Sequence, residues 1–214
     1  MGARVDWAAR LKRGLFLLCL LPLALLVWRG VAGGLGANPV EALTRGLGDW
    51  ALRFLLLTLA LSPLADLTHR SEPRRLRRLF GLFAFFYLCL HLASYTVLDQ
   101  FFDWRAIGAD IVKRPYITVG MAAFLLLVPL AATSTDAMIR RLGGRRWKRL
   151  HRLVYPAAVA GVVHYFMLVK ADVREPLIYG GILALLLGWR RIGHKKASTQ
   201  KAQRGKGENA EGSG

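Results

Sequence analysis

Two histidines, His91 and His164, lie inside long apolar segments and are the most informative residues of the sequence. An ionisable side chain in the hydrocarbon core of a membrane is costly and marks a functional site by default. His91 follows Arg78 by 13 residues and His164 follows Arg152 by 12, so two helices that enter from the same side would carry both imidazoles at one depth. This arrangement predicts a shared ligand, and haem iron held between facing helices is the candidate.

Small residues accompany both histidines on roughly the same helix faces: Ala157, Ala160 and Gly161 beside His164, and Gly81 and Ala84 beside His91. A porphyrin needs a shallow helix surface next to its axial ligand, which small side chains provide. The alternative is that these residues only let helices pack closely while the histidines hydrogen-bond across the interface.

The remaining histidines differ in their surroundings. His151 lies near the basic end of the fifth apolar segment, 13 residues before His164, so an ideal helix would not place the two on one face. Pro156 lies between them, and a kink there would change that phase. For His151, an interfacial residue and a ligand near the inner surface both remain open. His69 and His194 lie in polar segments and are expected to be solvated.

Arg53 is a further candidate because it lies just inside an apolar segment, between Trp50 and Phe54. A guanidinium in this position needs an anion or a route to the lipid headgroups. We predict that Arg53 pairs with a haem propionate, and the alternative is that it extends to the headgroups.

The elements that must position these residues are apolar segments of about 15 to 20 residues, each long enough as a helix to cross a hydrocarbon core of about 30 Å. The sequence contains six of them, at 14–28, 50–65, 79–98, 116–132, 150–169 and 177–189. Helices with almost no polar face exclude a water-soluble domain. We therefore predict an all-α integral membrane protein, a bundle of six transmembrane helices.

Basic residues indicate the orientation of this bundle. Of the 31 Lys and Arg residues, 23 lie at the two ends of the chain and in the second and fourth connections, which is the positive-inside pattern. Both termini are therefore predicted to be cytoplasmic. The net charge of +18 is explained by anionic headgroups and requires no nucleic acid.

The predicted membrane domain covers residues 10–192. Residues 1–9 form a cytoplasmic segment, and the basic tail 193–214 has a composition that predicts disorder. The first apolar segment follows Arg10, Lys12 and Arg13, so a cleaved signal peptide is the alternative to an uncleaved first helix, which we favour.

The cofactor chemistry is limited by motifs that the sequence lacks. Cys19 and Cys89 form neither a CxxC pair nor a CxxCH motif, so a haem would be bound without covalent attachment. The sequence has no GxGxxG after a strand and no P-loop. Electrons would therefore come from another protein or a lipid-soluble carrier.

Several long motifs follow one another along the chain: GANPVEALT from Gly36, WALRFLLLTLALSPL from Trp50, KRPYITVGM from Lys113, TSTDAMIRRLGGRRWKRLHRLVYP from Thr133 and VVHYFMLVK from Val162. In this order they resemble the MsrQ family, also called YedZ, within the ferric-reductase-like transmembrane superfamily. The resemblance covers residues 10–192.

The resemblance implies one b-type haem, or two, with His91 and His164 at matching ligand positions and His151 at a third. In related reductases an inner histidine precedes the position of His91 by 13 or 14 residues, where this chain has Arg78 or Arg77. The resemblance also implies FMN, for which the sequence shows no matching motif.

The function that the resemblance implies is electron transfer across the bacterial inner membrane. Electrons would come from the quinol pool or a cytosolic flavin reductase and leave to a periplasmic MsrP-like molybdopterin subunit that reduces methionine sulfoxide in proteins. The chain itself would carry out no bond chemistry on that substrate. The alternatives are a stand-alone ferric or other metal reductase, and a haem-free transporter or assembly factor with the histidines as a proton relay.

Overall fold

The computed structural model describes the backbone of residues 2–169 and 172–211 and the side chains of residues 12–169 and 172–192. All regular structure in these residues is helical. In chain order the elements are α1 (Gly2–Val31), α2 (Pro39–Leu67), α3 (Glu72–Ser94), the π-helix η1 (Tyr95–Asp99), α4 (Trp104–Lys113), α5 (Pro115–Ala132), α6 (Asp136–Leu142), α7 (Gly144–Leu150), the 3₁₀ turn η2 (His151–Leu153), α8 (Val154–Leu168) and α9 (Arg174–Glu211).

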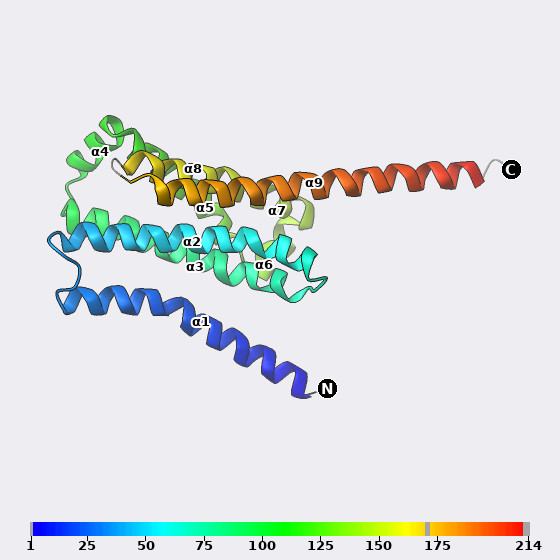
Figure 1. Cartoon of the computed structure of the whole chain (residues 1–214), viewed down its shortest axis with the longest axis horizontal. Helices are drawn as coiled ribbons and strands as arrows, with labels where there is room; N and C mark the ends of the chain where they lie inside the picture. The colour runs from blue at the N-terminus through cyan, green and yellow to red at the C-terminus, as the bar shows by residue number, and fades with distance from the viewer. Residues whose placement is uncertain (1, 170–171, 212–214) are drawn as a thin grey trace.

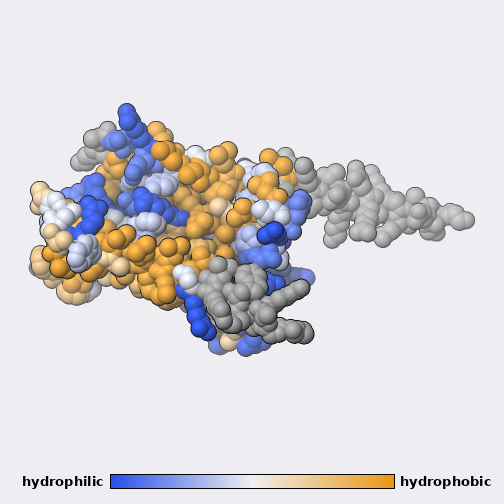
Figure 2. Space-filling model, turned by 60° about the horizontal axis from the view of Figure 1, so that its bottom comes forward, coloured by the Kyte–Doolittle hydropathy of each residue, from blue (hydrophilic) through white to orange (hydrophobic). Residues whose placement is uncertain are grey.

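Among the described residues, four stretches are long and apolar enough to cross a membrane: Lys12–Val31, Pro39–Leu67, Glu72–Asp99 and Pro115–Ala132. The predicted all-α membrane protein is confirmed at this level. Helices α8 and α9 cover the fifth and sixth predicted segments, and the count of six spans stays a prediction. Figure 2 shows hydrophobic residues over much of the middle of the molecule and hydrophilic residues gathered near both of its ends.

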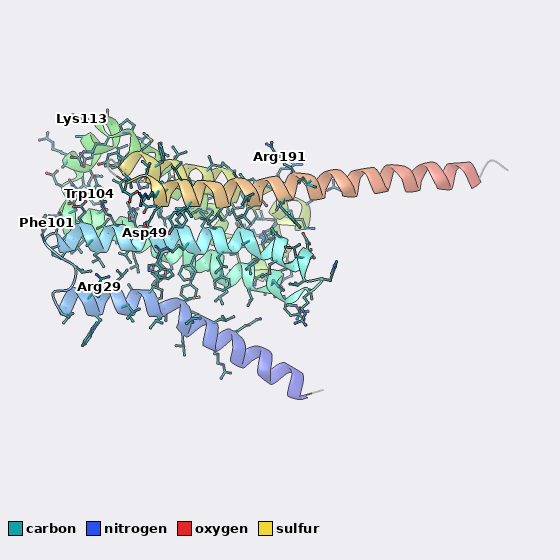
Figure 3. The ribbon with its side chains drawn as sticks, in the orientation of Figure 1. Arg29, Asp49, Phe101, Trp104, Lys113 and Arg191 are labelled. Atoms are coloured by element: carbon teal, nitrogen blue, oxygen red, sulfur yellow. The ribbon has the colours of Figure 1, made fainter. Side chains whose placement is uncertain are left out.

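The long helices run side by side, and the bundle has two distinct ends (Figure 1). One end carries the α2–α3 connection together with α6 and α7, and we call it the basic end. The other carries the α1–α2 connection and α4, and we call it the α4 end. Figure 3 shows Arg29, Phe101 and Trp104 at the α4 end, whereas Arg191 lies on α9 toward the opposite side.

Two helix pairs form the body of the bundle, because α2 packs along α3 and α5 packs along α8. Aromatic rings join the first pair: the ring of Phe54 on α2 lies 5.3 Å from that of Tyr87 and 5.8 Å from that of Phe83, both on α3. Tyr87 and Ala157 on α8 are both fully buried. The space between the two pairs is where the site lies.

Local capping explains the short helices α4 and α6, which lie in connections between the predicted apolar segments. The Asp103 carboxylate accepts from two backbone N–H groups at the start of α4, and the Thr135 hydroxyl accepts from Met138 N–H at the start of α6. Gly143 then ends α6 with a φ of 73°, which glycine adopts at little cost. Such caps are readable in sequence, but the apolar pattern alone does not reveal them.

Helix α9 continues to Glu211 through part of the predicted tail. The side chains of residues 193–211, and with them His194, lie outside the described residues. The prediction of a disordered tail at 193–214 therefore stays a prediction.

Helix α1 is held to α3 at a break in its own hydrogen-bond ladder. Pro22 has no N–H and its ring opens the preceding turn. The buried Tyr87 hydroxyl enters this opening, where it accepts from Leu23 N–H at 3.0 Å and donates to Cys19 C=O at 2.8 Å. One hydroxyl thus satisfies two backbone groups of α1.

Tyr87→Phe is expected to lower stability by about 1–3 kcal/mol, because both backbone groups of α1 would lose their partner in an apolar interior. Thermal unfolding of the purified protein in detergent measures this loss. Tyr155→Phe is the matched control, since no hydrogen bond to the Tyr155 hydroxyl is found among the described residues and its removal should leave the unfolding temperature nearly unchanged. Equal unfolding temperatures for the two variants would contradict this role of Tyr87.

Candidate functional site

A cavity of about 360 Å³ lies between α2, α3, α5 and α8, with both His91 and His164 in its wall. Small residues from all four helices line it: Gly48, Ala51, Ala84, Gly120, Ala123, Ala157 and Gly161. The predicted shallow surface is thus found at Ala84, Ala157 and Gly161. Gly81 instead faces the Thr58 side chain, and neither Gly81 nor Ala160 is part of the cavity wall.

The two imidazoles face each other across this cavity, as their matched depth predicts. Their ring centroids are 6.2 Å apart and the ring planes are nearly perpendicular, at 80°. His91 Nδ1 lies 2.8 Å from Thr44 C=O and His164 Nδ1 lies 2.6 Å from Tyr116 C=O. A carbonyl can only accept, so each Nδ1 carries the hydrogen and each Nε2 keeps its lone pair for a metal ion.

Two glycines make these contacts sterically feasible. A Cβ at Gly48 would lie 3.0 Å from His91 Nδ1, and a Cβ at Gly120 would lie 2.7 Å from His164 Nδ1. Real Cβ atoms scarcely ever come within 3.0 Å of another heavy atom. Each imidazole therefore packs directly on the backbone of the neighbouring helix.

The two halves of the site share a pattern that sequence reasoning missed. In each half the acceptor carbonyl precedes the glycine by four residues, at Thr44 and Gly48 on α2 and at Tyr116 and Gly120 on α5. Residues four apart are neighbours on one helix face, so one face presents both the acceptor and the space for the ring. The available signal was a glycine inside the apolar segment 116–132 and another two residues before the segment 50–65.

Arg53 is not brought to the cavity. Its Nε donates to the Tyr179 hydroxyl on α9 at 2.8 Å, and its guanidinium lies 4.9 Å from the ring centre of Trp50. These contacts satisfy the charge without an anion in the cavity. The geometry therefore lends no support to the predicted propionate contact.

Two other arginines line the α4 end of the cavity, and sequence reasoning did not single them out. Arg45 pairs with Glu41 at 2.6 Å, and Arg114 pairs with Asp110 at 3.1 Å. The hydrogen bond from Arg114 to the Tyr116 hydroxyl raises the pKa of the guanidinium, so Arg114 remains charged. These side chains could bind acidic groups that reach the cavity entrance.

The other predicted residues lie at the basic end, away from the cavity. The His151 ring stacks on Trp147 with centroids 3.9 Å apart. Arg78 forms an ion pair of 2.6 Å with Asp136, and this hydrogen bond lowers the pKa of the Asp136 carboxyl. Arg77 Nε and His151 Nε2 are both buried with no hydrogen-bond partner among the described residues.

Comparisons with known proteins agree with this arrangement. The sequence profile of a family described as "Ferric reductase like transmembrane component" matches residues 47–162, which cover α3 and α5 and most of α2 and α8. A Rhodospirillum rubrum protein named "Protein-methionine-sulfoxide reductase heme-binding subunit MsrQ" is 66% identical over 180 residues, which are 83% of this chain and 85% of the relative. The chain belongs to the MsrQ family.

More distant MsrQ proteins bear the same printed name. The Azospira oryzae protein is 58% identical over 184 residues, 85% of this chain and 78% of that protein. The Caulobacter vibrioides protein is 53% identical over 175 residues, 82% of this chain and 83% of that protein. The resemblance to the MsrQ family found in the motifs is thus confirmed.

Two glycine-to-alanine variants, one inside the site and one outside it, are expected to change the free energy of unfolding in opposite directions. Gly120→Ala should displace the His164 ring and lower stability by about 1–3 kcal/mol through the lost hydrogen bond. Gly188→Ala on α9, where nothing lies within 4 Å, should raise it by up to about 1 kcal/mol through helix propensity. Thermal unfolding in detergent measures both changes, and a gain at Gly120 would contradict the packing described above.

Proposed function

We propose that this protein is a membrane b-type cytochrome of a methionine sulfoxide reductase system, with haem iron held between His91 and His164. Its MsrQ relatives are named as haem-binding subunits of such a system. The observation that carries the proposal is the 6.2 Å between the two ring centroids. A metal–imidazole bond of about 2 Å, with about 1.1 Å from nitrogen to ring centre, places two rings about 6 Å apart across one ion.

The donor set fits a haem better than a metal held by side chains alone. No group of three or more His, Cys, Asp or Glu suited to a metal ion occurs in the part of the chain that the structure describes. Two neutral imidazoles with their Nδ1–H groups fixed by carbonyls are a typical axial pair. The small residues and mainly apolar wall suit a flat macrocycle, and neither Cys19 nor Cys89 lines the cavity, which supports non-covalent binding.

Haem supplies one-electron transfer at this position. The chain's own residues contribute the two ligands, their tautomers and an apolar wall that limits water. We propose that the protein passes electrons to an MsrP-like molybdopterin subunit in the periplasm, and that the final chemistry on methionine sulfoxide takes place there.

For the topology we propose six transmembrane helices in the bacterial inner membrane with both termini in the cytoplasm. The excess of Lys and Arg at the basic end supports this orientation. His91 lies three residues before the end of α3 at Ser94, and His164 lies four before the end of α8 at Leu168, so the cavity is near the α4 end. In this orientation the haem would lie in the outer half of the membrane, close to a periplasmic acceptor.

Electrons must also reach this haem from the cytoplasmic side. We propose an inner relay near His151, Arg77 and Arg78, which would be a second haem, a bound FMN or a quinone headgroup. The donor would be the quinol pool or a cytosolic flavin reductase. The buried, unpartnered Nε2 of His151 supports a ligand at this end, whereas Arg78 is already paired with Asp136.

A second candidate function is a stand-alone metal reductase with the same haem. The match to the ferric reductase like family favours it. Turnover that depends on the molybdopterin subunit would distinguish the first function from the second, because a metal reductase needs no such partner.

His91→Ala and His164→Ala are each expected to abolish the Soret band of the purified protein, because either change removes an axial ligand. His69→Ala, in a polar connection, is the matched control and should keep the full band. His151→Ala should cause a partial loss if an inner haem is present. Wild-type protein without a Soret band would exclude the cytochrome.

The cations at the α4 end of the cavity should tune the redox potential. Arg45→Gln and Arg114→Gln are expected to lower the midpoint potential by tens of millivolts, because a lost positive charge near the haem stabilises the oxidised state. Arg53→Gln serves as the comparison and should change it less. Redox titration followed optically measures all three, and the largest shift at Arg53 would restore the pairing predicted from the sequence.

A further inference from the structure

A second cavity of about 360 Å³ lies at the basic end, between α2, α3, α8 and α9. Its polar wall contains three arginines, Arg74, Arg77 and Arg190, and a single carboxylate, Asp66. Its apolar wall is formed mainly by Leu59, Leu186 and Leu187. The cavity is distinct from the histidine cavity, with which it shares no lining residue.

The positive charges of this cavity are not balanced by its own residues. Asp66 pairs with Arg74. Arg77 has a buried Nε with no hydrogen-bond partner in the part of the chain that the structure describes, and Arg190 lies 4.5 Å from the ring centre of Tyr155. Neither Arg77 nor Arg190 forms an ion pair with any residue that the structure describes.

The contrast along α3 shows that this imbalance is local. Arg74 and Arg78 are four residues apart on α3, which is about one helical turn. Each has a carboxylate partner: Arg74 pairs with Asp66, and Arg78 pairs with Asp136. Arg77, between them, points into the cavity without one. A guanidinium that is partly buried and unpaired is costly unless an anion joins it.

An oxyanion with several acceptor oxygens would satisfy both arginines. A phosphate group accepts bidentate, charge-assisted hydrogen bonds from guanidinium groups. Such a phosphate could belong to an anionic lipid or to a soluble phosphate ester.

The walls of the cavity favour a lipid. Leucines line it beside the arginines, so a bound molecule would meet both charge and apolar surface. Trp189, partly exposed at its rim, is a residue type enriched at membrane interfaces. Basic pockets between transmembrane helices on the cytoplasmic side bind anionic lipid headgroups in this way.

We propose that this cavity is a binding site for the phosphate of an anionic phospholipid of the inner leaflet, with Arg77 and Arg190 as its ligands. The acyl chains lie along the leucine wall, and the headgroup bridges α3 and α9. The site is independent of the haem proposed between His91 and His164, since it uses neither histidine. It shares Arg77 with the proposed inner relay.

The test is thermal unfolding of the full-length protein in detergent micelles, with phosphatidylglycerol or phosphatidylcholine added. Phosphatidylglycerol is expected to raise the unfolding temperature of the wild type more than phosphatidylcholine does. Arg77→Gln and Arg190→Gln should each weaken the apparent affinity for phosphatidylglycerol about tenfold or more, as expected for a lost charge-assisted hydrogen bond. Arg75→Gln is the matched control, because Arg75 lies on the same helix, is exposed and does not line the cavity.

Two results would overturn the proposal. One is an equal response of the wild type to both lipids, which needs no variant to be folded. The other is a full response to phosphatidylglycerol in Arg77→Gln and Arg190→Gln. A parallel arm with inorganic phosphate identifies the source: stabilisation by phosphate alone, equal to that by phosphatidylglycerol, would overturn the lipid and assign the site to a soluble phosphate ester. The Soret band, followed in each sample, reports the histidine site separately.

Discussion

The hydrogen bond from an imidazole Nδ1–H to a carbonyl of the neighbouring helix is the constraint on which the site depends. It requires a helix carbonyl within reach, which Thr44 and Tyr116 provide, and a backbone surface without a Cβ, which Gly48 and Gly120 provide. The bond fixes the spacing of α2 from α3 and of α5 from α8. The directions of both imidazoles in the cavity between the pairs are then set before any cofactor enters. Binding therefore costs little side-chain entropy.

The two ends of the bundle treat charge differently. At the α4 end, polar side chains find partners within the protein, as in Tyr95 donating to Asp110 and Arg53 donating to Tyr179. At the basic end Arg74 and Arg78 are also paired, but the buried Nε of Arg77 has no hydrogen-bond partner among the described residues. A membrane protein can keep an unpaired arginine at this boundary because lipid phosphates supply the anion there. The bilayer then completes part of the protein's structure.

Much of the fold could be predicted because membrane-crossing helices need long apolar segments, and these are visible in the sequence. The shared level of His91 and His164 in the bundle followed from their spacing in the sequence. The direction of Arg53 could not be predicted, since it depends on Tyr179, which lies 126 residues away. Depth in the membrane is a one-dimensional property that sequence spacing encodes. The rotation of a helix about its own axis is set by its tertiary partners. The contacts of the two histidines with carbonyls depend on this rotation, so they could not be predicted.

The bond between Tyr87 and α1 has a consequence for biosynthesis. Leu23 precedes Tyr87 by 64 residues, so α1 enters the bilayer well before its partner is made. Until α3 arrives, Leu23 N–H and Cys19 C=O can bond only to each other, as an ordinary helical pair four residues apart. Helix α1 therefore crosses the membrane early but acquires its final rotation late. Lipid-facing leucines such as Leu17 and Leu18 do not distinguish one rotation from another. The rotation is instead set by contacts with later helices, among them the Tyr87 hydroxyl and the packing of Phe16 against Phe83.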